Sequence, residues 1–156
     1  MKILLLGYGK MGKAIEQEAL QRGHQIVHKI DVDNQAALAT LDPTTIDVAI
    51  EFSQPQAAYD NIRQCLSQGI PVISGTTGWL EKREAIETYC QAQKGTFFYA
   101  SNFSIGMNLF FKINAFLAKL MDQRPEYEVT IEETHHLEKK DAPSGTAITL
   151  AEDIMQ

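Results

Sequence analysis

The stretch THHLEKKDAPSGTA, Thr134 to Ala147, contains two adjacent histidines, two adjacent lysines and a Ser-Gly-Thr run. Ser144, Gly145 and Thr146 come just before a helical pattern over 147–155. Their N–H groups and hydroxyls are therefore predicted to form a nest for a carboxylate at a helix N-terminus. This grouping favours an anionic substrate.

The cations of the same stretch suit proton transfer as well as binding. Lys139 can meet a second carboxylate or deliver a proton, and His135 or His136 can do either near neutral pH. Taken singly, a histidine at a strand end or a pair of lysines is usually an ordinary solvent-exposed surface feature without a functional role. Their grouping beside Ser-Gly-Thr predicts a functional role for the cluster.

A second chemical motif, GYGKMG, follows the apolar run Ile3–Leu6 directly. Its three glycines have separable roles: Gly7 permits a tight turn, Gly9 lets the backbone approach a pyrophosphate, and Gly12 allows close packing of helix and strand. The alternative is a purely structural glycine turn. Because a predicted strand precedes the motif and a predicted helix follows it, the interpretation as a dinucleotide-binding turn is favoured.

Asp31 ends the next predicted strand, where a carboxylate can accept hydrogen bonds from both ribose hydroxyls. A carboxylate repels a 2′-phosphate, and Val32 and Asp33 offer no cation to bind one, so we expect NADH to be favoured over NADPH. Lys10 and Lys29 are the residues that could supply compensating charge.

SGTTGW, Ser74 to Trp79, follows a further predicted strand at the edge where ligands of open sheets bind. Gly75, Thr76 and Thr77 could line the nicotinamide and its ribose. Thr76 or Thr77 could also cap the next helix, and the two roles are compatible. The stretches EFS and ASNFS occupy equivalent positions after two other predicted strands.

The elements that position these motifs alternate along the chain. After the first strand, a helix runs to Gly23, and short apolar runs predict the remaining strands, with two further helices between the last three and a minimal crossover over 32–45. These strands are expected at 24–31, 46–52, 70–74 and 95–101, and the helices at 55–68 and 79–93. The alternation predicts an α/β fold, a Rossmann-like doubly wound parallel sheet.

The periodicity changes near residue 103. A long apolar helix is expected around Leu109–Leu120, and EYEVTIEETHH at 126–136 alternates with period two, which is typical of a strand. We therefore predict a dinucleotide-binding domain over 1–103 and the first part of an α+β substrate domain over 104–156.

Bulk properties exclude several partners. A net charge of −6 and a pI near 5.2 argue against nucleic acid and anionic membrane surfaces, and no signal peptide or membrane span is apparent. We expect a cytoplasmic protein. Cys65 and Cys90 lack metal-site spacing and are expected to be reduced thiols, so no metal site is predicted.

The run EETHHLEKKDAPSGTA resembles the signature of the dihydrodipicolinate reductases, also called 4-hydroxy-tetrahydrodipicolinate reductases, of lysine and diaminopimelate synthesis. GYGKMG, EFS, SGTTGW and SNFSIGMN match the family in the same order, so the resemblance covers essentially the whole chain. It implies reduction, by NADH or NADPH, of a cyclic imine that carries two carboxylates.

The resemblance also implies site residues. His135 matches the proposed acid or base and Lys139 the proton donor, while the substrate carboxylates would be held by His136, Lys139, Ser144, Gly145 and Thr146. The cofactor site would include Gly7, Gly9, Met11, Gly12, Asp31, Phe52, Gly75, Thr77, Ala100, Asn102 and Phe103.

Family members continue beyond the position of Gln156 with strands that complete a sheet and build a homotetramer. We therefore expect an incomplete second domain here and no tetramer. Two other functions stay open: a dinucleotide-binding domain without turnover, and a reductase of another small carboxylate. The cation-rich run argues against the last, since a monocarboxylate needs fewer cations.

Overall fold

The computed structural model describes residues 1–135, 137 and 142–155. It divides the chain into two compact units, Met1–Ala100 and Ser101–Gln156. Two predicted site residues, His136 and Lys139, lie outside the described residues.

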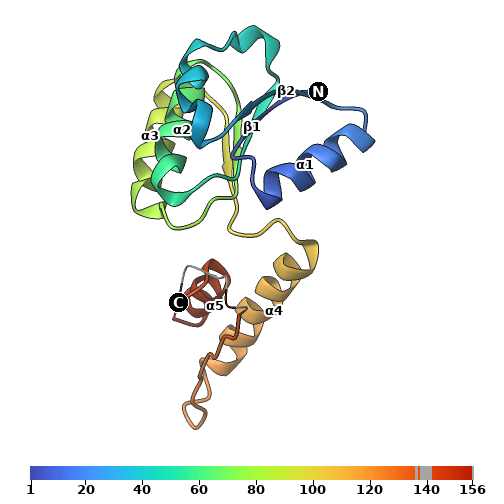
Figure 1. Cartoon of the computed structure of the whole chain (residues 1–156). Helices are drawn as coiled ribbons and strands as arrows, with labels where there is room; N and C mark the ends of the chain where they lie inside the picture. The colour runs from blue at the N-terminus through green and yellow to red at the C-terminus, as the bar shows by residue number, and fades with distance from the viewer. Residues whose placement is uncertain (136, 138–141, 156) are drawn as a thin grey trace. The chain divides into compact units, whose positions relative to one another are not determined.

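The first unit contains a five-stranded parallel sheet with the order β2-β1-β3-β4-β5 (Figure 1). The strands are β1 (Lys2–Leu6), β2 (Gln25–Ile30), β3 (Val48–Glu51), β4 (Val72–Ser74) and β5 (Phe97–Tyr99). All five predicted strands are formed, and the Rossmann-like class is confirmed. The strand order reverses between β1 and β3, because the chain moves from β1 to β2 and then crosses back over β1.

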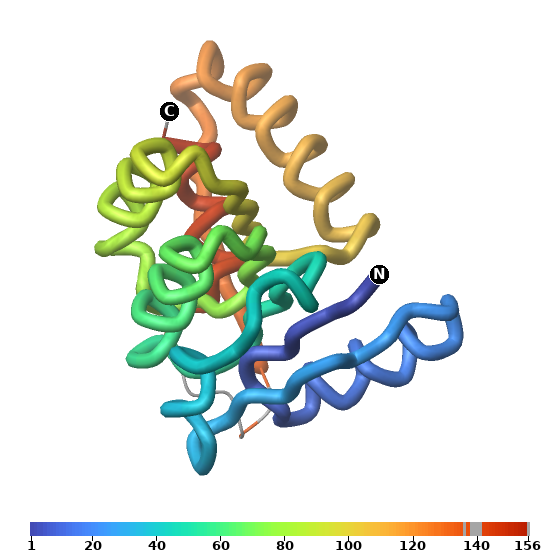
Figure 2. Tube along the Cα trace, turned by 90° about the horizontal axis from the view of Figure 1, so that it is seen from above, coloured from blue at the N-terminus to red at the C-terminus, as the bar shows by residue number. Residues whose placement is uncertain are grey.

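Helices cover both faces of this sheet. Alternate side chains of β1 point to opposite sides: Leu4 and Leu6 join the core under α2 (Pro55–Ser67) and α3 (Arg83–Ala92), whereas Ile3 and Leu5 pack with Ala19 of α1 (Lys10–Gln21). Both views place α1 apart from α2 and α3, which lie side by side (Figures 1 and 2). The helices thereby fix the turns that follow the strands.

The crossover from β2 to β3 consists of two 3₁₀ helices, η1 (Val32–Thr40) and η2 (Pro43–Thr45), as the expected minimal link. Asp31 starts η1: its backbone N–H donates to Asn34 Oδ1 at 2.7 Å and its Oδ1 accepts from Val32 N–H at 2.9 Å. Leu38, 2% exposed, anchors the segment in the core. The link is therefore held at a defined place beside β2.

The described part of the second unit contains the helices α4 (Ile105–Met121) and α5 (Gly145–Met155), which pack together. Ser104 caps α4 through Oγ, which accepts from Met107 N–H at 3.4 Å. None of the described helices in either unit is long and apolar enough to cross a membrane.

The strand predicted over 126–136 is not formed in its described part, residues 126–135. A strand is stabilised by pairing with a neighbour, and the described residues of the second unit form no strand with which it could pair. Its predicted apolar face is also open, with Tyr127 63% and Val129 56% exposed. Sequence alternation alone was an insufficient signal here.

Candidate functional site

Five of the predicted cofactor residues form one row across the first unit. The strand ends are in register, since Leu6 pairs with both Ile30 and Glu51, Glu51 with Ser74, and Ser74 with Tyr99. The residues that follow the five strands continue that row: Gly7, Asp31, Phe52, Gly75 and Ala100. Backbone N–H groups of Gly7, Phe52, Gly75 and Ala100 donate to neighbouring strands at 2.8–3.3 Å.

A pocket of about 340 Å³ lies at the carboxyl ends of β1, β2 and β3, where the strand order reverses. In open α/β sheets this is the place where ligands bind. Of the predicted residues, Gly7, Gly9, Asp31 and Phe52 line it. The lining also includes residues that the sequence analysis did not single out, among them Tyr8, Gln35, Ser53, Gln56 and Asn61.

The three glycines of the turn have different surroundings. Gly7 has φ +88°, and a Cβ there would lie 2.1 Å from Phe52 O. A Cβ on Gly12 would lie 2.3 Å from Gly7 O, so the close contact is between helix and turn, not between helix and strand as expected. A Cβ on Gly9 would meet nothing within 4 Å. Gly9 therefore leaves open space for the approach of a ligand.

Gly9 is also the N-cap of α1, and no side chain caps that end of the helix. The first N–H groups of a helix have no partner within it and favour anions. Across the pocket, the exposed Asp31 carboxylate supplies hydrogen-bond acceptors. Donors and acceptors at these two places match a phosphate and a ribose.

Lys29, which could have compensated the charge of Asp31, is engaged elsewhere. Its Nζ lies 2.6 Å from Glu16 Oε1 and 3.1 Å from Tyr8 Oη, and Tyr8 Oη donates to Glu16. Hydrogen bonds to Glu16 and then Tyr8 raise the pKa of Lys29, and the hydrogen bond from Lys29 is the main cause that lowers the pKa of Glu16. The charge of Lys29 is thus balanced by Glu16.

A buried carboxylate lies behind the row, in the stretch EFS, and the sequence analysis gave it no role of its own. Glu51 is 0% exposed at the end of β3 and accepts hydrogen bonds from Ser53 N–H (2.9 Å), Ser53 Oγ, Ser74 Oγ (2.6 Å) and Thr76 Oγ1 (2.9 Å). Because a buried charge is costly unless hydrogen-bonded, these donors account for its presence. Glu51 fixes the loops after β3 and β4.

The prediction that Thr76 or Thr77 caps a helix is wrong. The helices after β4, η3 (Leu80–Lys82) and α3, have Trp79 and Lys82 as their N-cap residues, and neither makes a side-chain capping hydrogen bond. Thr76 is instead held by Glu51, and its carbonyl accepts from Trp79 Nε1 at 2.7 Å. Gly75 is required for another reason, since a Cβ there would lie 2.2 Å from the Phe52 ring.

The remaining predicted cofactor residues lie elsewhere. Met11, 51% exposed, is in the first turn of α1, and Thr77 is half-buried after β4. Asn102 and Phe103 belong to the second unit, where Asn102 Oδ1 accepts from Ser104 N–H at 2.8 Å.

In the second unit, Glu133 joins the predicted catalytic residue His135 to the predicted substrate-binding residue Ser144. Its carboxylate accepts from Ser144 N–H at 2.9 Å and Ser144 Oγ at 2.5 Å, and lies 2.8 Å from His135 Nε2. The hydrogen bond from the Ser144 hydroxyl is the main cause that lowers the pKa of Glu133 to about 2, and His135 adds to it. The predicted carboxylate nest thus holds a carboxylate, that of the protein itself.

Helix α5 begins at Gly145, two residues earlier than expected. Gly145 and Thr146 therefore belong to its first turn, and Ser144 Oγ accepts from Ala147 N–H at 3.0 Å. Ser144 is 5% exposed. It thus connects the helix start with Glu133.

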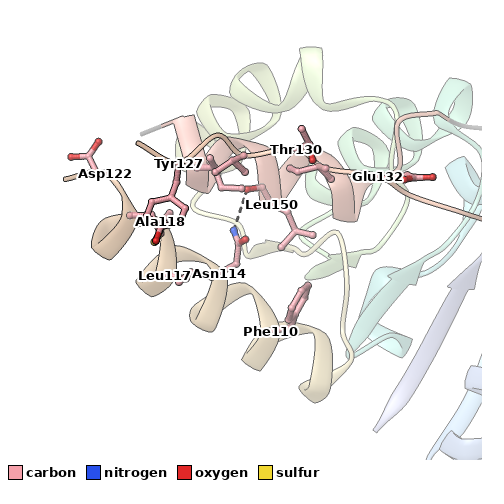
Figure 3. Close-up of a pocket in the computed structure, with 13 residues that line it drawn as sticks. Phe110, Asn114, Leu117, Ala118, Asp122, Tyr127, Thr130, Glu132 and Leu150 are labelled. Atoms are coloured by element: carbon pink, nitrogen blue, oxygen red, sulfur yellow. Dashed lines mark hydrogen bonds between the residues drawn. The ribbon is translucent and has the colours of Figure 1, made fainter. Parts of the chain in front are cut away.

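A second pocket, of about 530 Å³, lies between α4, α5 and residues 127–132 (Figure 3). Its walls are mostly apolar, with Phe110, Leu117 and Leu150 among them. Asn114 Nδ2 donates to Leu150 O at 3.1 Å and ties the two helices together (Figure 3). None of the predicted site residues that the structure describes lines this pocket.

The parallel sheet, the glycine turn and the pocket at the reversal of strand order define a Rossmann-like α/β protein. The family model described as dihydrodipicolinate reductase, N-terminus, matches residues 1–103, and the one described as dihydrodipicolinate reductase, C-terminus, matches residues 106–156. The chain belongs to the dihydrodipicolinate reductase family.

Two relatives are named 4-hydroxy-tetrahydrodipicolinate reductase. The one from Christiangramia forsetii is 50% identical over 156 residues, which are 100% of this chain and 64% of that protein. The one from Methanocaldococcus jannaschii is 39% identical over 115 residues, 73% of this chain and 41% of that protein. The chain thus spans less than two thirds of the length of either relative.

Solved structures agree with the fold. A dipicolinate-bound dihydrodipicolinate reductase from Paenisporosarcina sp. TG-14 matches with a TM-score of 0.73 and 25% identity, over 99% of this chain and 65% of that one. A putative homoserine dehydrogenase from Archaeoglobus fulgidus, with a TM-score of 0.53 and 15% identity over 64% of this chain and 42% of that one, shares the fold alone.

Proposed function

We propose that this chain takes part in the NAD(P)H-dependent reduction of 4-hydroxy-tetrahydrodipicolinate to tetrahydrodipicolinate, a step of diaminopimelate and lysine biosynthesis in the cytoplasm. The family membership and the names of the two relatives support this reaction. The dipicolinate bound to the structurally similar reductase supports a small cyclic dicarboxylate as the substrate class.

The observation that carries the proposal is the row of strand-end residues around the pocket of the first unit. A dinucleotide fits this pocket in three respects: open space at Gly9, the uncapped start of α1, and the exposed carboxylate of Asp31. Gly9 and the first turn of α1 would hold the pyrophosphate, and Asp31 would accept from the ribose hydroxyls.

NADH is the favoured cofactor in this proposal. The Asp31 carboxylate would repel a 2′-phosphate, and the pairing of Lys29 with Glu16 at 2.6 Å leaves that cation balanced. We therefore expect a lower dissociation constant for NADH than for NADPH.

On the substrate side, the donors of Ser144 are suited to a carboxylate, since they already bind that of Glu133. A substrate carboxylate could take this place once Glu133 moves aside. Gly145 and Thr146 would add N–H groups from the first turn of α5, and His136 and Lys139 would supply cations. Two carboxylates on one ring would use all of these groups.

Proton handling falls to Lys139 and His135. When bound, the reduced nicotinamide supplies the hydride that adds at C4 of the dehydrated ring. Lys139 then donates a proton to the resulting enamine, and its ammonium stabilises the negative charge that develops on the ring. His135, oriented by Glu133 at 2.8 Å, would act as the acid or base that assists.

Calorimetric titration with pyridine-2,6-dicarboxylate, a planar analogue of the substrate ring, tests the proposal. In the presence of NADH this dicarboxylate should bind, and pyridine-2-carboxylate should bind at least tenfold more weakly because it lacks one anchor. Equal affinity for the two compounds would favour a reductase of a monocarboxylate and contradict the proposed substrate.

A further inference from the structure

A hydrogen-bonded chain of side chains leads from the buried Glu51 to the wall of the pocket in the first unit. Ser53 Oγ donates to Glu51, Asn61 Nδ2 donates to Ser53 Oγ at 3.2 Å, and Gln35 Nε2 donates to Asn61 Oδ1. Both Asn61 and Gln35 line the pocket, but Asn61 is only 1% exposed, whereas Gln35 is an exposed residue. The chain thus connects the core to the site.

Glu51 sets the direction of every bond in this chain. Glu51 accepts hydrogen bonds from Ser53, Ser74 and Thr76, so the one hydroxyl hydrogen of Ser53 is used on Glu51. The other acceptor near that hydroxyl, Gln54 O, is 3.5 Å away and uncharged. Ser53 Oγ therefore has only a lone pair to offer to Asn61.

The direction is passed on through the two amides. Asn61 must turn its NH₂ group to Ser53, which leaves its carbonyl oxygen for Gln35. Gln35 turns its NH₂ group to Asn61, which uses one of its two N–H donors and leaves its carbonyl oxygen for a ligand. Gln35 thereby offers a carbonyl oxygen as an acceptor in the pocket that Asp31 also lines.

We propose that Gln35 is a specificity-determining residue, held by Glu51 through Ser53 and Asn61, that selects a cofactor with a free ribose hydroxyl over one with a 2′-phosphate. This inference rests on the proposed function, because it assumes that a nicotinamide dinucleotide occupies the pocket. A hydroxyl can donate to Gln35 Oε1 or to Asp31, whereas an ionised phosphate has no hydrogen to donate to either oxygen and is repelled by the Asp31 carboxylate.

Dissociation constants for NADH and NADPH, measured by the fluorescence of the reduced nicotinamide, test this role. Gln35→Ala should weaken NADH binding about three- to tenfold, the loss of one hydrogen bond. It should leave NADPH binding unchanged or make it tighter. The NADPH-to-NADH ratio, which is the dissociation constant for NADPH divided by that for NADH, should therefore fall. Gln56→Ala, at another exposed glutamine of the same pocket, is the matched control and should leave the ratio unchanged.

Glu51→Gln tests the positioning role of the carboxylate. An amide can donate as well as accept, so Ser53 and Asn61 are no longer held in one direction, and the NADPH-to-NADH ratio should fall as in Gln35→Ala. If Glu51 had a merely structural role, Glu51→Gln would weaken the binding of NADH and NADPH equally and leave the ratio unchanged. Ser53→Ala breaks the same chain without altering the buried charge, and it should give the same fall in the ratio if Glu51→Gln does not fold.

The outcomes separate this inference from the proposed function. If the unaltered protein binds neither nucleotide, the proposed function fails and this inference fails with it. If the protein binds nucleotide and Gln35→Ala leaves the ratio unchanged, only the role of Gln35 is overturned.

Discussion

At the scale of single residues, Glu133 is the centre of the described part of the cation-rich segment. It accepts two hydrogen bonds from Ser144 and lies 2.8 Å from His135 Nε2. Substitution of Glu133 by a residue without a carboxylate would leave Ser144 and His135 without their common acceptor. Glu133 therefore sets the orientation of His135 and the position of the start of α5.

The titration of Glu133 is a direct test of this arrangement. Its pKa is lowered to about 2 from the usual value of 4.5, so its stabilising contribution is present above pH 4.5 and is lost as the pH falls toward 2. Carbon-detected NMR of the side-chain carboxyl should show this. Ser144→Ala removes the largest cause and should raise the pKa; an unchanged value would contradict the role of the Ser144 hydroxyl.

Turnover tests the proton donor. We expect Lys139→Ala to lower kcat by orders of magnitude, because the enamine then lacks its acid, and His135→Ala to lower it by less. Steady-state kinetics of both variants, with folding checked by circular dichroism, would show this order. Near-normal activity of Lys139→Ala would refute the proposed proton transfer.

The reactivity of the Cys65 thiol, on α2, tests how tightly the core beside Glu51 is packed. It is 0% exposed, and burial, with a smaller effect of the Glu51 charge, raises its pKa to about 12. The thiolate is the reactive form, so iodoacetamide at pH 8 should leave Cys65 unmodified in the folded protein and alkylate it in urea. Mass spectrometry distinguishes it from Cys90; rapid native alkylation of Cys65 would contradict the packing.

The site residues at the ends of strands could be predicted from the sequence. Those that come to the site from other elements, such as Gln35 and Asn61, were not predicted. Gly7, Asp31 and Phe52 stand at the ends of predicted strands, and parallel strands bring such positions to one edge. Gln35 lies on a 3₁₀ helix, and the hydrophobic periodicity of the sequence does not predict where that helix runs. Asn61 had a signal: it is a polar residue on the same helical face as the buried Ala58 and Ile62.

At the scale of elements, the turn between β1 and α1 holds the clearest division of labour. Gly12 serves packing, since a Cβ there would lie 2.3 Å from the backbone oxygen of Gly7, and Gly9 serves the ligand, since a Cβ there would meet nothing within 4 Å. The sequence motif predicted all three glycines. It misjudged only the contact of Gly12, which depends on how closely the helix folds back on its own turn.

Alanine substitutions separate these roles. Gly12→Ala should lower the free energy of unfolding by about 1–3 kcal/mol through overpacking against backbone. Gly9→Ala should change it by about 1 kcal/mol or less, because only the N-cap preference is altered, yet weaken NADH binding at least tenfold. Urea unfolding and NADH titration measure the two effects; equal stability losses would contradict the assignment.

The predicted helices and strands of the first unit formed because period and turn residues agreed at every element. Residues 126–135 differ: their alternation of apolar and polar residues is clear, but a strand requires a partner, and none is formed in the described part of the second unit. Local pattern predicts which segments suit a sheet. It does not supply the neighbour.

At the scale of the whole molecule, the two units contribute different chemistry to the proposed reaction. The first unit carries the dinucleotide pocket, and the second carries Glu133, His135 and the start of α5. Both are matched by models of one family, and the chain spans 64% of the length of its relative from Christiangramia forsetii. The reductase activity is therefore the claim that most needs a direct test.

That test is the oxidation of NADH and NADPH by this chain, followed at 340 nm, with the unstable substrate generated in situ by the preceding synthase. We predict oxidation that requires the chain, the synthase and the nucleotide together, and that is faster with NADH than with NADPH at low nucleotide concentration. Binding of NADH without any substrate-dependent oxidation would contradict the proposed reductase function and leave a dinucleotide-binding protein without turnover.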